Sequence, residues 1–461
     1  MKHSFIIALA VLLLSCSGKQ AEGLSFDPGA GTPGSLTLPT GRQVNYTAYE
    51  RLYYVTEVAD STYQFLNVYV PEGATQRSPI FFRTYVGAFM ASAAGAPRPG
   101  DASGRALAEG CVVVIPGSRG HNSQVDGRFN GRAPAGLLDL KAAVRYLRLF
   151  DAVMPGSAER IITDGTSAGG AMSALLGATG NDPVYEPLLD AMGAARQQDH
   201  VFASVCYCPI IDIDHADMAY EWLFRQTDSR LAGSDEQKAV AARLADAYPA
   251  YLAGLDLRKP DGSVLDGGNM MEYLREILTA SAQKAKDAGA VISPELGFSY
   301  GGAPAGRGEY LTDLDMTAYL NYVVGRTPLK GVPSFDSKDV LGSRPSPENS
   351  EFGDETGSSV NFTAASAAYN GRQLDPGVAE RVFMMNPMNF VGRAGADNAP
   401  HWYIRHGALD RDTAFPIPVI FATRLQNEGL DVDFDLAWNR PHSGDYALGE
   451  LFAWVHRITG D

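Results

Sequence analysis

The sequence is poor in cysteine and in positive charge, and it lacks a long apolar run beyond its N-terminus. Only 4 of 461 residues are Cys, too few for a disulfide framework in a chain of this length. Lys and Arg number 38 against 53 Asp and Glu, the net charge is −15, and no basic stripe is visible. This argues against nucleic acid or an anionic membrane surface as a partner. No later apolar run is long enough to cross a bilayer.

The overall composition is that of a soluble globular protein. Hydrophobic residues make up 45% of the chain and charged residues 20%, which excludes a disordered, collagen-like or coiled-coil chain. The length exceeds that of one average domain, so we expect a large core with a substantial insertion or a second domain. The acidity suits a small, neutral or weakly acidic substrate.

The N-terminus has the features of a bacterial export signal. Lys2 precedes the apolar stretch Phe5–Leu14, and Leu13-Leu14-Ser15-Cys16 resembles a lipobox. We therefore predict a lipoprotein signal over residues 1–16 and lipidation of Cys16, followed by a tether and N-terminal segment over 17–44. The alternative is a plain secretory signal with an incidental Cys.

The remaining cysteines do not indicate a metal or redox site. Cys111 begins an apolar strand and is expected to be a buried hydrophobic residue. Cys206 and Cys208 have the wrong spacing for a Cys-x-x-Cys site and lie on one face of a predicted strand. We predict no metal and no cofactor.

Strands and helices alternate over residues 45–212 and 401–461, a pattern typical of a doubly wound, mostly parallel α/β sheet. Short apolar runs bounded by Gly and Pro predict buried strands, and segments with helical spacing follow them. The predicted strands are 64–70, 79–85, 111–115, 160–164, 201–211, 401–406 and 432–438, and the predicted helices are 137–150, 169–176 and 448–458.

Residues 213–400 interrupt this alternation. Helices are predicted at 218–225, 236–252, 271–288 and 317–324, with a Gly-rich stretch at 298–308 and a long polar loop at 333–359. We interpret this segment as a lid domain inserted at the carboxyl end of a sheet strand, where α/β proteins place their ligand sites. The alternative is a purely structural insertion.

Ser167 has the sequence context of a catalytic nucleophile. Gly165-Thr166-Ser167-Ala168-Gly169 follows a predicted strand and precedes a helix of small residues, as a G-x-S-x-G nucleophile elbow requires. The backbone N–H of Ala168 would be one oxyanion donor. The second donor is assigned to the Val86–Ala88 region around Gly87, where related esterases carry a His-Gly-Gly-Gly stretch. A structural Gly/Ser turn is the alternative.

The base and the acid are expected near the C-terminus, because hydrolases of this kind use the order Ser, Asp or Glu, His. His442 follows the last predicted strand and is the predicted base, with His406 as the rival. Asp410 occupies an H-G-x-x-D pattern after a strand and is the predicted acid, leaving Asp412 at the pocket mouth. Either aspartate could instead cap a helix.

Three motifs together resemble the bacterial tannases of the α/β-hydrolase superfamily: GTSAGGAMSALLG, RHGALDRDT and AWNRPHSGDY. The resemblance covers nearly the whole mature chain and includes the LNVYVPE strand. It implies an α/β-hydrolase fold with a lid inserted between the last core strands, and a triad of Ser167, Asp410 and His442. Esterases for ferulate and related acids share the elbow and the fold.

The resemblance also implies how a galloyl ring would be recognised. The family reads the ring hydroxyls with a Lys and a Glu of the lid and with the Asp two residues after the triad Asp, here Asp412. We carry the lid pair over to Lys338 and Glu351, with Glu348 as the rival for the carboxylate. Without the resemblance, these residues would be taken as charges in a solvated loop.

We therefore predict a tannase, a serine esterase that releases gallic acid from galloyl esters without a cofactor. Its partner would be the small-molecule ester, with no nucleic acid, and it would be anchored to the bacterial cell envelope only through Cys16. One alternative is an esterase for ferulate or other phenolic acids. Another is a non-catalytic surface lipoprotein that binds phenolics.

Overall fold

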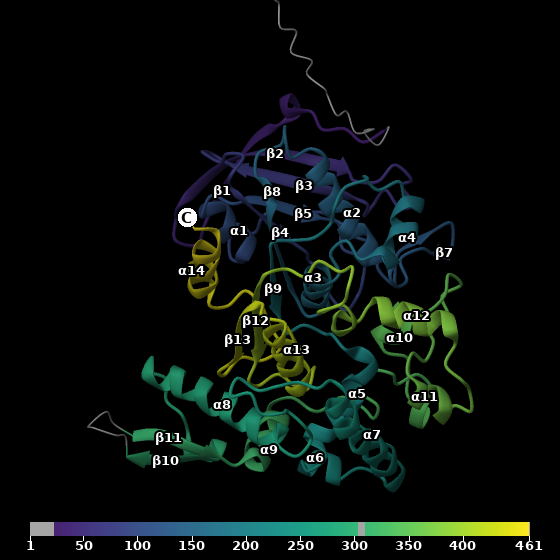
Figure 1. Cartoon of the computed structure of the whole chain (residues 1–461), viewed down its shortest axis with the longest axis vertical. Coiled ribbons are helices and arrows are strands. Elements are labelled where there is room, and N and C mark those ends of the chain that lie inside the picture. Colours follow the sequence, from purple (N-terminus) through teal and green to yellow (C-terminus); the bar gives the residue numbers. More distant parts are fainter. Residues whose placement is uncertain (1–22, 303–308, 461) are drawn as a thin grey trace, which may run out of the picture.

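A mixed nine-stranded sheet forms the centre of the computed structural model, which describes residues 23–302 and 309–460 (Figure 1). Its strand order is β1-β2-β3-β5-β4-β8-β9-β12-β13. The strands from β5 to β13 run parallel, whereas β1, β2 and β3 pair antiparallel and β3 pairs antiparallel with β5. The predicted α/β fold with a mostly parallel sheet is confirmed. The strands are β1 Thr32–Thr37, β2 Gln43–Tyr53, β3 Phe65–Pro71, β4 Pro79–Arg83, β5 Val112–Pro116, β8 Ser157–Thr166, β9 Ala203–Tyr207, β12 His401–Gly407 and β13 Asp431–Ala437.

Helices cover both faces of this sheet. On one face α2, α3 and α13 pack in the larger apolar core, and on the other α1 and α14 pack in a second core. The bounds of these helices are α1 Ala102–Ala108, α2 Ala135–Leu149, α3 Ala168–Ala178, α13 Pro416–Asn427 and α14 Leu448–Thr459. Strands β4, β5 and β9 are buried along their whole length, as expected for apolar strands covered on both sides.

The N-terminal part of the sheet was not predicted. β1 lies within residues 17–44, which were interpreted as a tether and N-terminal segment, and β2 was not recognised as a strand. β1 is an edge strand with a mostly exposed surface and contains Pro33 and Gly34, so its sequence lacks the apolar pattern of a buried strand. Cys16 lies outside the described residues.

The chain leaves the sheet after β9 and returns at β12, and the segment between them carries mainly helices (Figure 1). The four predicted helices of this segment are present, each shifted by a few residues. The Gly-rich stretch contributes β10 to an antiparallel hairpin with β11, and residues 303–308 lie outside the described part. The elements are α5 Ile213–Phe224, α6 Asp228–Leu231, α7 Asp235–Gly254, α8 Met270–Asp287, β10 Phe298–Gly302, β11 Glu309–Leu314, α9 Met316–Arg326, α10 Pro347–Glu351, α11 Ala364–Tyr369 and α12 Pro376–Met384.

Short elements complete the described chain: α4 Glu186–Ala191, the hairpin of β6 Gln124–Val125 and β7 Arg128–Phe129, and single 3-10 turns. Among the described residues, no helix combines the length and the apolarity needed to cross a membrane.

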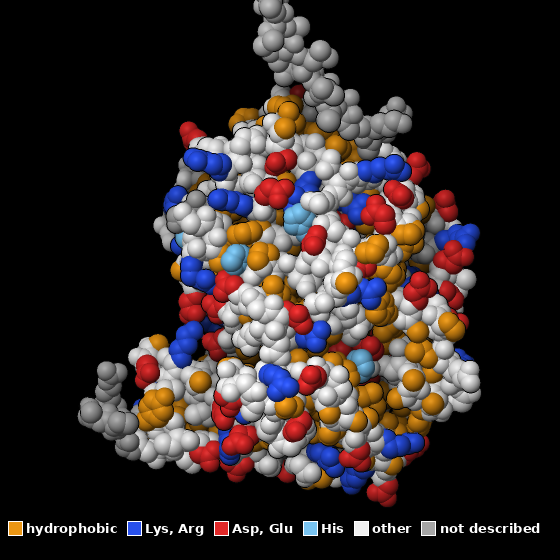
Figure 2. All heavy atoms as spheres, viewed as in Figure 1, with side chains coloured by type: hydrophobic (Ala, Val, Ile, Leu, Met, Phe, Trp, Pro, Cys, Tyr) orange, Lys and Arg blue, Asp and Glu red, His pale blue; other side chains and the backbone are white. Residues whose placement is uncertain are grey.

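On the face shown in Figure 2, acidic, basic and apolar side chains are interspersed.

Candidate active site

Ser167 lies at the sharp turn between β8 and α3. Its backbone has φ 62° and ψ −124°, a conformation that residues other than glycine rarely adopt. The turn is held by a 2.9 Å hydrogen bond from the Ser167 N–H to the Tyr207 carbonyl at the end of β9. The serine side chain therefore stands at the carboxyl edge of the sheet, at the start of a helix.

The glycines on either side of this serine are required by close backbone contacts. A Cβ atom at Gly165 would lie 2.2 Å from the Gly169 carbonyl oxygen, and a Cβ atom at Gly169 would lie 2.9 Å from the Val86 carbonyl oxygen. Only glycine fits at both places, which is the physical reason for the G-x-S-x-G spacing.

The structure brings Ser167, His442 and Asp410 into one hydrogen-bonded chain. The Nε2 atom of His442 lies 2.8 Å from Ser167 Oγ, and its Nδ1 atom lies 2.7 Å from Asp410 Oδ2. Asp410 follows β12 and His442 follows β13, so both reach the nucleophile from the carboxyl ends of neighbouring strands. This is the order nucleophile, base, orienting acid that activates a serine hydroxyl.

The charges around this chain favour an ionised Asp410. Burial would raise the pKa of Asp410, but the hydrogen bonds that its carboxylate accepts from His442 and from the Asp412 N–H lower it, and the pKa lies below its usual range. Its Oδ1 atom accepts a 2.7 Å hydrogen bond from the Asp412 backbone N–H. Burial lowers the pKa of His442, whereas the Asp410 carboxylate raises it, and the net direction is upward. A neutral His442 with its proton on Nδ1 would donate to Asp410 and accept the Ser167 proton at Nε2.

His406, the rival base, does not contact the nucleophile. It is fully buried beneath the site, with its Nε2 atom 3.7 Å from Asp410 Oδ2. Burial lowers its pKa, so it is expected to be neutral. Its position favours a role in packing around Asp410, and His442 is the histidine at Ser167.

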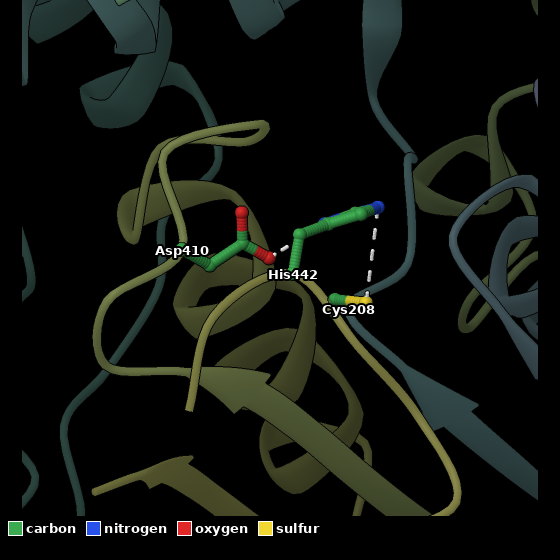
Figure 3. A group of neighbouring side chains, drawn as sticks. All are labelled: Cys208, Asp410 and His442. Carbon is green, nitrogen blue, oxygen red and sulfur yellow. Dashed lines mark hydrogen bonds and ion pairs between the residues drawn. The ribbon is translucent and has the colours of Figure 1, made fainter. Parts of the chain in front are cut away.

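Cys208 lies beside the base, which the sequence did not indicate (Figure 3). Its Sγ atom is 4.0 Å from His442 Nε2 and donates to the Ser443 carbonyl over 3.4 Å. Burial raises the pKa of this thiol, so it remains protonated at neutral pH. The available signal was its position directly after β9, at the carboxyl edge of the sheet.

The loop predicted to supply the second oxyanion donor lies against the nucleophile helix, since the carbonyl oxygens of Val86 and Thr84 face Gly169. Ala88 and Phe89 both have positive φ, 49° and 55°, so the backbone of this loop turns sharply. A Cβ atom at Gly87 would meet open space, and sterics therefore do not require glycine there. The roles of Ala168 and Gly87 remain predictions.

Asp412 is at the site, and it caps no helix. Helix α13 begins only at Pro416, with Phe415 as its capping residue. The Oδ2 atom of Asp412 lies 3.9 Å from His442 Nδ1, and Oδ1 pairs with Arg411. With its side chain 32% exposed, Asp412 can contact a ligand next to the base.

The two residues assigned to the lid pair have other partners. Lys338 Nζ pairs with its neighbour Asp339. Glu351 is buried in the electrostatic range of Arg132, and burial raises its pKa to about 8. No hydrogen bond or ion pair joins either side chain to Asp412 or to the triad in the described residues, and their assignment to the ring stays a prediction.

Glu348, the rival for the carboxylate, lies within the electrostatic range of Asp412 and of Lys330. Glu348 is buried, and its pKa is raised by burial and by the negative charge of Asp412 but lowered by the positive charge of Lys330. Both partners thus lie within electrostatic range of this carboxylate. Lys330 is half-buried, with Nζ 4.0 Å from the centre of the Phe335 ring. Lys330 was not recognised because it precedes the loop in which the basic residue was sought.

Two groups of side chains in the described residues have the composition of metal ligands. One is Cys208, Asp410 and His442, and the other is Asp212, Asp214 and His215. In both groups the donor atoms hydrogen-bond to protein neighbours, including Ser167 for the first group and Asn386 for the second. We derive no metal chemistry from either group.

Known proteins resemble this chain over nearly its full length. A tannase from Fusobacterium nucleatum is 34% identical, with 95% of this chain and 99% of that chain covered and a TM-score of 0.84. A tannin acyl hydrolase from Lactobacillus plantarum is 37% identical, with 94% and 98% covered and a TM-score of 0.86. A tannin acyl hydrolase solved in complex with ethyl gallate is 36% identical, with the same coverage and a TM-score of 0.85.

The other comparisons are narrower. The BD-FAE family model matches residues 66–248, which include the nucleophile elbow. No curated protein matches the chain. Identities of 34–38% over at least 94% of the chain, together with the shared fold, assign its family. The chain belongs to the bacterial tannase family of the α/β-hydrolase superfamily.

Proposed function

We propose that this chain hydrolyses galloyl esters to gallic acid and an alcohol or phenol, through an acyl-enzyme on Ser167. The observation that carries the proposal is the hydrogen-bonded chain Ser167–His442–Asp410 at the carboxyl edge of the sheet. Its similarity to tannases, one of them bound to ethyl gallate, supports the galloyl ester as substrate.

In the first half-reaction, Ser167 Oγ attacks the ester carbonyl carbon while its proton moves to His442 Nε2. Asp410 stabilises the resulting imidazolium. The bond to the leaving oxygen then breaks, and that oxygen takes the proton from Nε2. A backbone N–H at Ala168 and a second donor in the Val86–Ala88 loop would stabilise the oxyanion, each by about 3 kcal/mol.

In the second half-reaction, water attacks the acyl-enzyme carbonyl and gives one proton to His442 Nε2. The bond between the carbonyl carbon and Ser167 Oγ breaks, and Oγ recovers the proton. Gallic acid leaves with the oxygen that came from water, and the free enzyme is restored.

Recognition of the ring is assigned to Asp412, Glu348 and Lys330. Adjacent phenolic hydroxyls are donors that carboxylates accept, while an ammonium group donates to a phenolic oxygen. The position of Glu348 within the electrostatic range of both Asp412 and Lys330 supports the assignment, which we propose in preference to Lys338 and Glu351. An ester without ring hydroxyls would offer no hydrogen-bond partner to these three groups, which provides selectivity.

The test compares kcat/KM for methyl gallate and methyl benzoate in single variants. Asp412→Ala, Glu348→Gln and Lys330→Met should each lower the gallate value by about 10- to 150-fold, the equivalent of one hydrogen bond to a charged group. The benzoate value should change little, because benzoate lacks the hydroxyls. Glu351→Gln and Lys338→Met are the matched controls and should leave the gallate-to-benzoate ratio unchanged.

Two results would overturn the proposal. A wild-type enzyme that turns over methyl ferulate faster than methyl gallate would be an esterase for other phenolic acids. A wild-type protein whose Ser167 is not labelled by a fluorophosphonate would be non-catalytic. An equal loss on gallate and benzoate in Asp412→Ala would instead assign Asp412 to support of the triad.

We also propose that the enzyme is exported and held at the bacterial cell envelope by a lipid on Cys16. The lipobox-like Leu13–Cys16 at the end of the apolar stretch supports this location. A single acyl chain binds membranes only weakly, so stable anchoring requires more than one chain on the terminal residue.

A further inference from the structure

The nucleophile and the base are carried by chain segments that are far apart in the sheet. Ser167 follows β8, whereas His442 lies in the connection between β13 and α14, here called the His442 loop (residues 438–447). β9 and β12 separate β8 from β13, so the loop must extend back across two strands. Contacts with β8, or with β4 beyond it, would hold the His442 loop in that position.

Arg83 provides such a contact. It is the last residue of β4, the neighbour of β8 on the side away from β9, and its side chain is only 5% exposed. One guanidinium nitrogen, Nη1, pairs with Asp164 in β8. The other, Nη2, donates to Asp445 Oδ2 in the His442 loop over 2.8 Å.

These partners stand in matching positions around the reacting groups. Asp164 lies three residues before Ser167, and Asp445 lies three residues after His442. We propose that Arg83 and Asp445 are positioning residues that hold the His442 loop against the nucleophile strand and so fix the distance between Ser167 and His442. The inference rests on the proposed acyl-enzyme function and adds residues that act through the triad.

The hydrogen bonds and the backbone conformation of Asp445 suit this positioning role. Its Oδ1 atom accepts a 2.9 Å hydrogen bond from the Ala102 N–H, so both carboxylate oxygens are used. Its φ is 56°, a left-handed conformation that Asp and Asn adopt more readily than most residues. The loop therefore combines a local backbone preference with two long-range hydrogen bonds at one residue.

The neighbours of Asp445 bring the same loop into contact with the nucleophile strand β8 and with the adjacent strand β9. A Cβ atom at Gly444 would lie 1.9 Å from Thr166 Oγ1, so the loop backbone packs directly on the residue before Ser167. The Tyr446 carbonyl accepts a 2.9 Å hydrogen bond from the Tyr207 hydroxyl. Among these contacts, Arg83 is the one that forms ion pairs with both β8 and the His442 loop.

Arginine is suited to this role because its planar guanidinium donates in two directions at once. A lysine could neutralise Asp164, but its single ammonium would not reach both carboxylates in the same geometry. Asp164 is fully buried and must keep a positive partner for the fold to remain stable. A substitution at position 83 can thus keep the positive charge beside Asp164 while removing the hydrogen bond to Asp445.

The principal test is Asp445→Asn. Its amide oxygen can still accept from Ala102, and Asn tolerates the left-handed backbone, but its NH₂ group cannot accept from Arg83. A displacement on the order of 1 Å costs about 100-fold in rate, so kcat on methyl gallate should fall by about 10- to 100-fold with KM nearly unchanged. The melting temperature should stay near that of the wild type. A kcat within threefold of wild type, or a loss that only follows the unfolded fraction, would overturn the proposal.

Arg83→Lys tests the same hydrogen bond by changing its donor. It retains the charge beside Asp164 and should lower kcat by a similar factor. The double variant Arg83→Lys/Asp445→Asn should be no slower than the slower single variant, because both remove one interaction. If the two losses multiply, the residues act independently and the proposal fails.

Asp182→Asn is the matched control. Asp182 also accepts from one backbone N–H, that of Val184 at 3.0 Å, and from one arginine, Arg393 Nε at 3.0 Å. It follows the end of α3 opposite to Ser167. Its kcat should equal that of the wild type, and a loss comparable to that of Asp445→Asn would overturn the proposal.

A second readout separates this inference from the galloyl assignment. The rate of Ser167 inactivation by a fluorophosphonate depends on activation by His442 and not on the ring. It should fall in Asp445→Asn and Arg83→Lys by the same factor as kcat. If the wild type reacts with the probe but hydrolyses no gallate ester, the proposed substrate is wrong, and the inactivation rates of the variants still decide the positioning role.

Discussion

The Asp410 carboxylate controls the pH at which His442 can act as a base. It accepts from His442 Nδ1 over 2.7 Å and raises the pKa of the imidazole against the opposing effect of burial. Only neutral His442 can take the Ser167 proton, so activity should rise as the pH rises through this pKa.

We therefore predict that Asp410→Asn shifts the acid limb of the kcat/KM profile to lower pH. The carboxylate that favours the imidazolium is lost, so His442 becomes neutral at a lower pH. The maximal rate should nevertheless fall by about 10⁴-fold, because the amide no longer selects the reactive tautomer. The measurement is the pH dependence of methyl gallate hydrolysis. A limb that moves to higher pH would contradict the role of Asp410.

Glu351 gives a second prediction at the scale of single residues. Burial raises its pKa to about 8 although Arg132 lowers it, and its Oε2 atom has no hydrogen-bond partner in the described part of the chain. The folded pKa lies above the unfolded value of about 4.3, so between these values the native state holds one proton more. Stability should therefore fall with rising pH, by up to about 1.4 kcal/mol per unit from this group.

Glu351→Gln should remove this contribution, because glutamine cannot ionise. Urea unfolding at pH 5.5, 7.0 and 8.5 should give a smaller decrease in the free energy of unfolding for the variant than for the wild type. Glu355→Gln is the control, since the Glu355 side chain is 59% exposed. If the wild type and Glu351→Gln show the same dependence, Glu351 is ionised in the folded protein.

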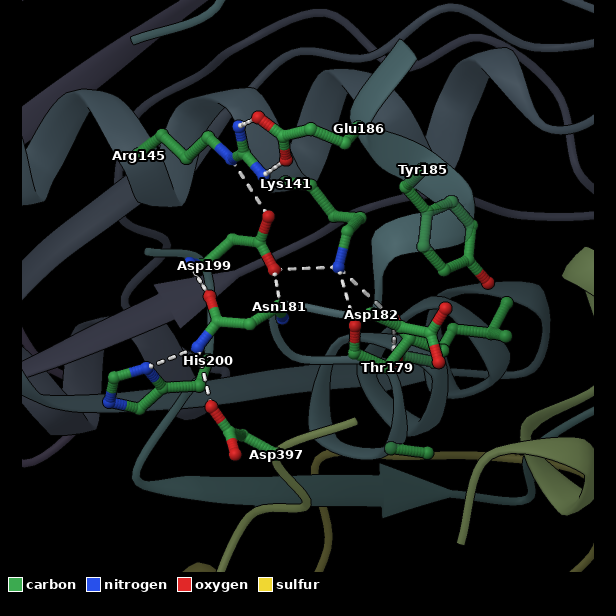
Figure 4. Close-up of polar contacts among 12 residues, drawn as sticks. Lys141, Arg145, Thr179, Asn181, Asp182, Tyr185, Glu186, Asp199, His200 and Asp397 are labelled. Carbon is green, nitrogen blue, oxygen red and sulfur yellow. Dashed lines mark hydrogen bonds and ion pairs between the residues drawn. The ribbon is translucent and has the colours of Figure 1, made fainter. Parts of the chain in front are cut away.

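At the scale of elements, a buried ionic network joins α2 to the chain before β9 (Figure 4). Lys141 of α2 is fully buried and donates to Asp199 over 2.7 Å and to the Thr179 carbonyl, just after α3, over 2.8 Å. Arg145, one turn later in α2, donates through Nε to the second Asp199 oxygen over 2.8 Å. One aspartate thus pairs with two cations of the same helix, and Glu186 supplies a second carboxylate to Arg145.

We predict that Asp199→Asn destabilises the protein by about 3–5 kcal/mol, the effect of leaving a buried charge unpaired. Glu186→Gln, which changes the 47% exposed partner of Arg145, should cost no more than about 1 kcal/mol. Urea unfolding at pH 7 measures both. Equal, small effects would show that water compensates Lys141 in the variant.

The same network predicts a loss of stability in acid. Lys141 and Arg145 hold the pKa of Asp199 below its usual range, although burial alone would raise it. The stabilisation is therefore present above the unfolded pKa of about 3.9 and is lost as the pH falls through the folded value.

At the scale of the whole molecule, the parallel sheet collects the functional residues at one edge. The segments that follow β8, β9, β12 and β13 contribute Ser167, Cys208, Asp410 and His442. The segment between β9 and β12 contributes Glu348, which lies within the electrostatic range of Asp412. This arrangement agrees with the general location of ligand sites in α/β sheets.

The proposed anchor predicts that catalysis and location are separable. Cys16→Ser should move the enzyme from the membrane fraction of the native host to the soluble fraction, because the lipid-accepting thiol is lost. The kcat on methyl gallate should not change, since every proposed catalytic residue lies far along the chain from residue 16. Mass spectrometry should detect an acylated N-terminus at Cys16 in the wild type. An unmodified terminus at another residue would leave a secreted enzyme.

The sequence by itself determined the fold class, the family and the residues that meet at Ser167. Short-range patterns carry this information: apolar strands bounded by Gly and Pro, the G-x-S-x-G turn, and the motifs around Asp410 and His442. β1 was missed because an exposed edge strand needs no apolar pattern. The lipidation of Cys16, the cellular location that it implies, and the domain boundaries at residues 213 and 400 stay predictions.

Only the tertiary structure decided which charges meet across the fold. Nothing local in the polar loop distinguishes Glu348 from its rival Glu351, and both are buried, but only the fold brings Glu348 into the electrostatic range of Asp412. The contact of Arg83 with Asp445 joins residues 362 positions apart. Such pairs leave no local period in the sequence, because their partners are selected by the packing of distant strands and loops.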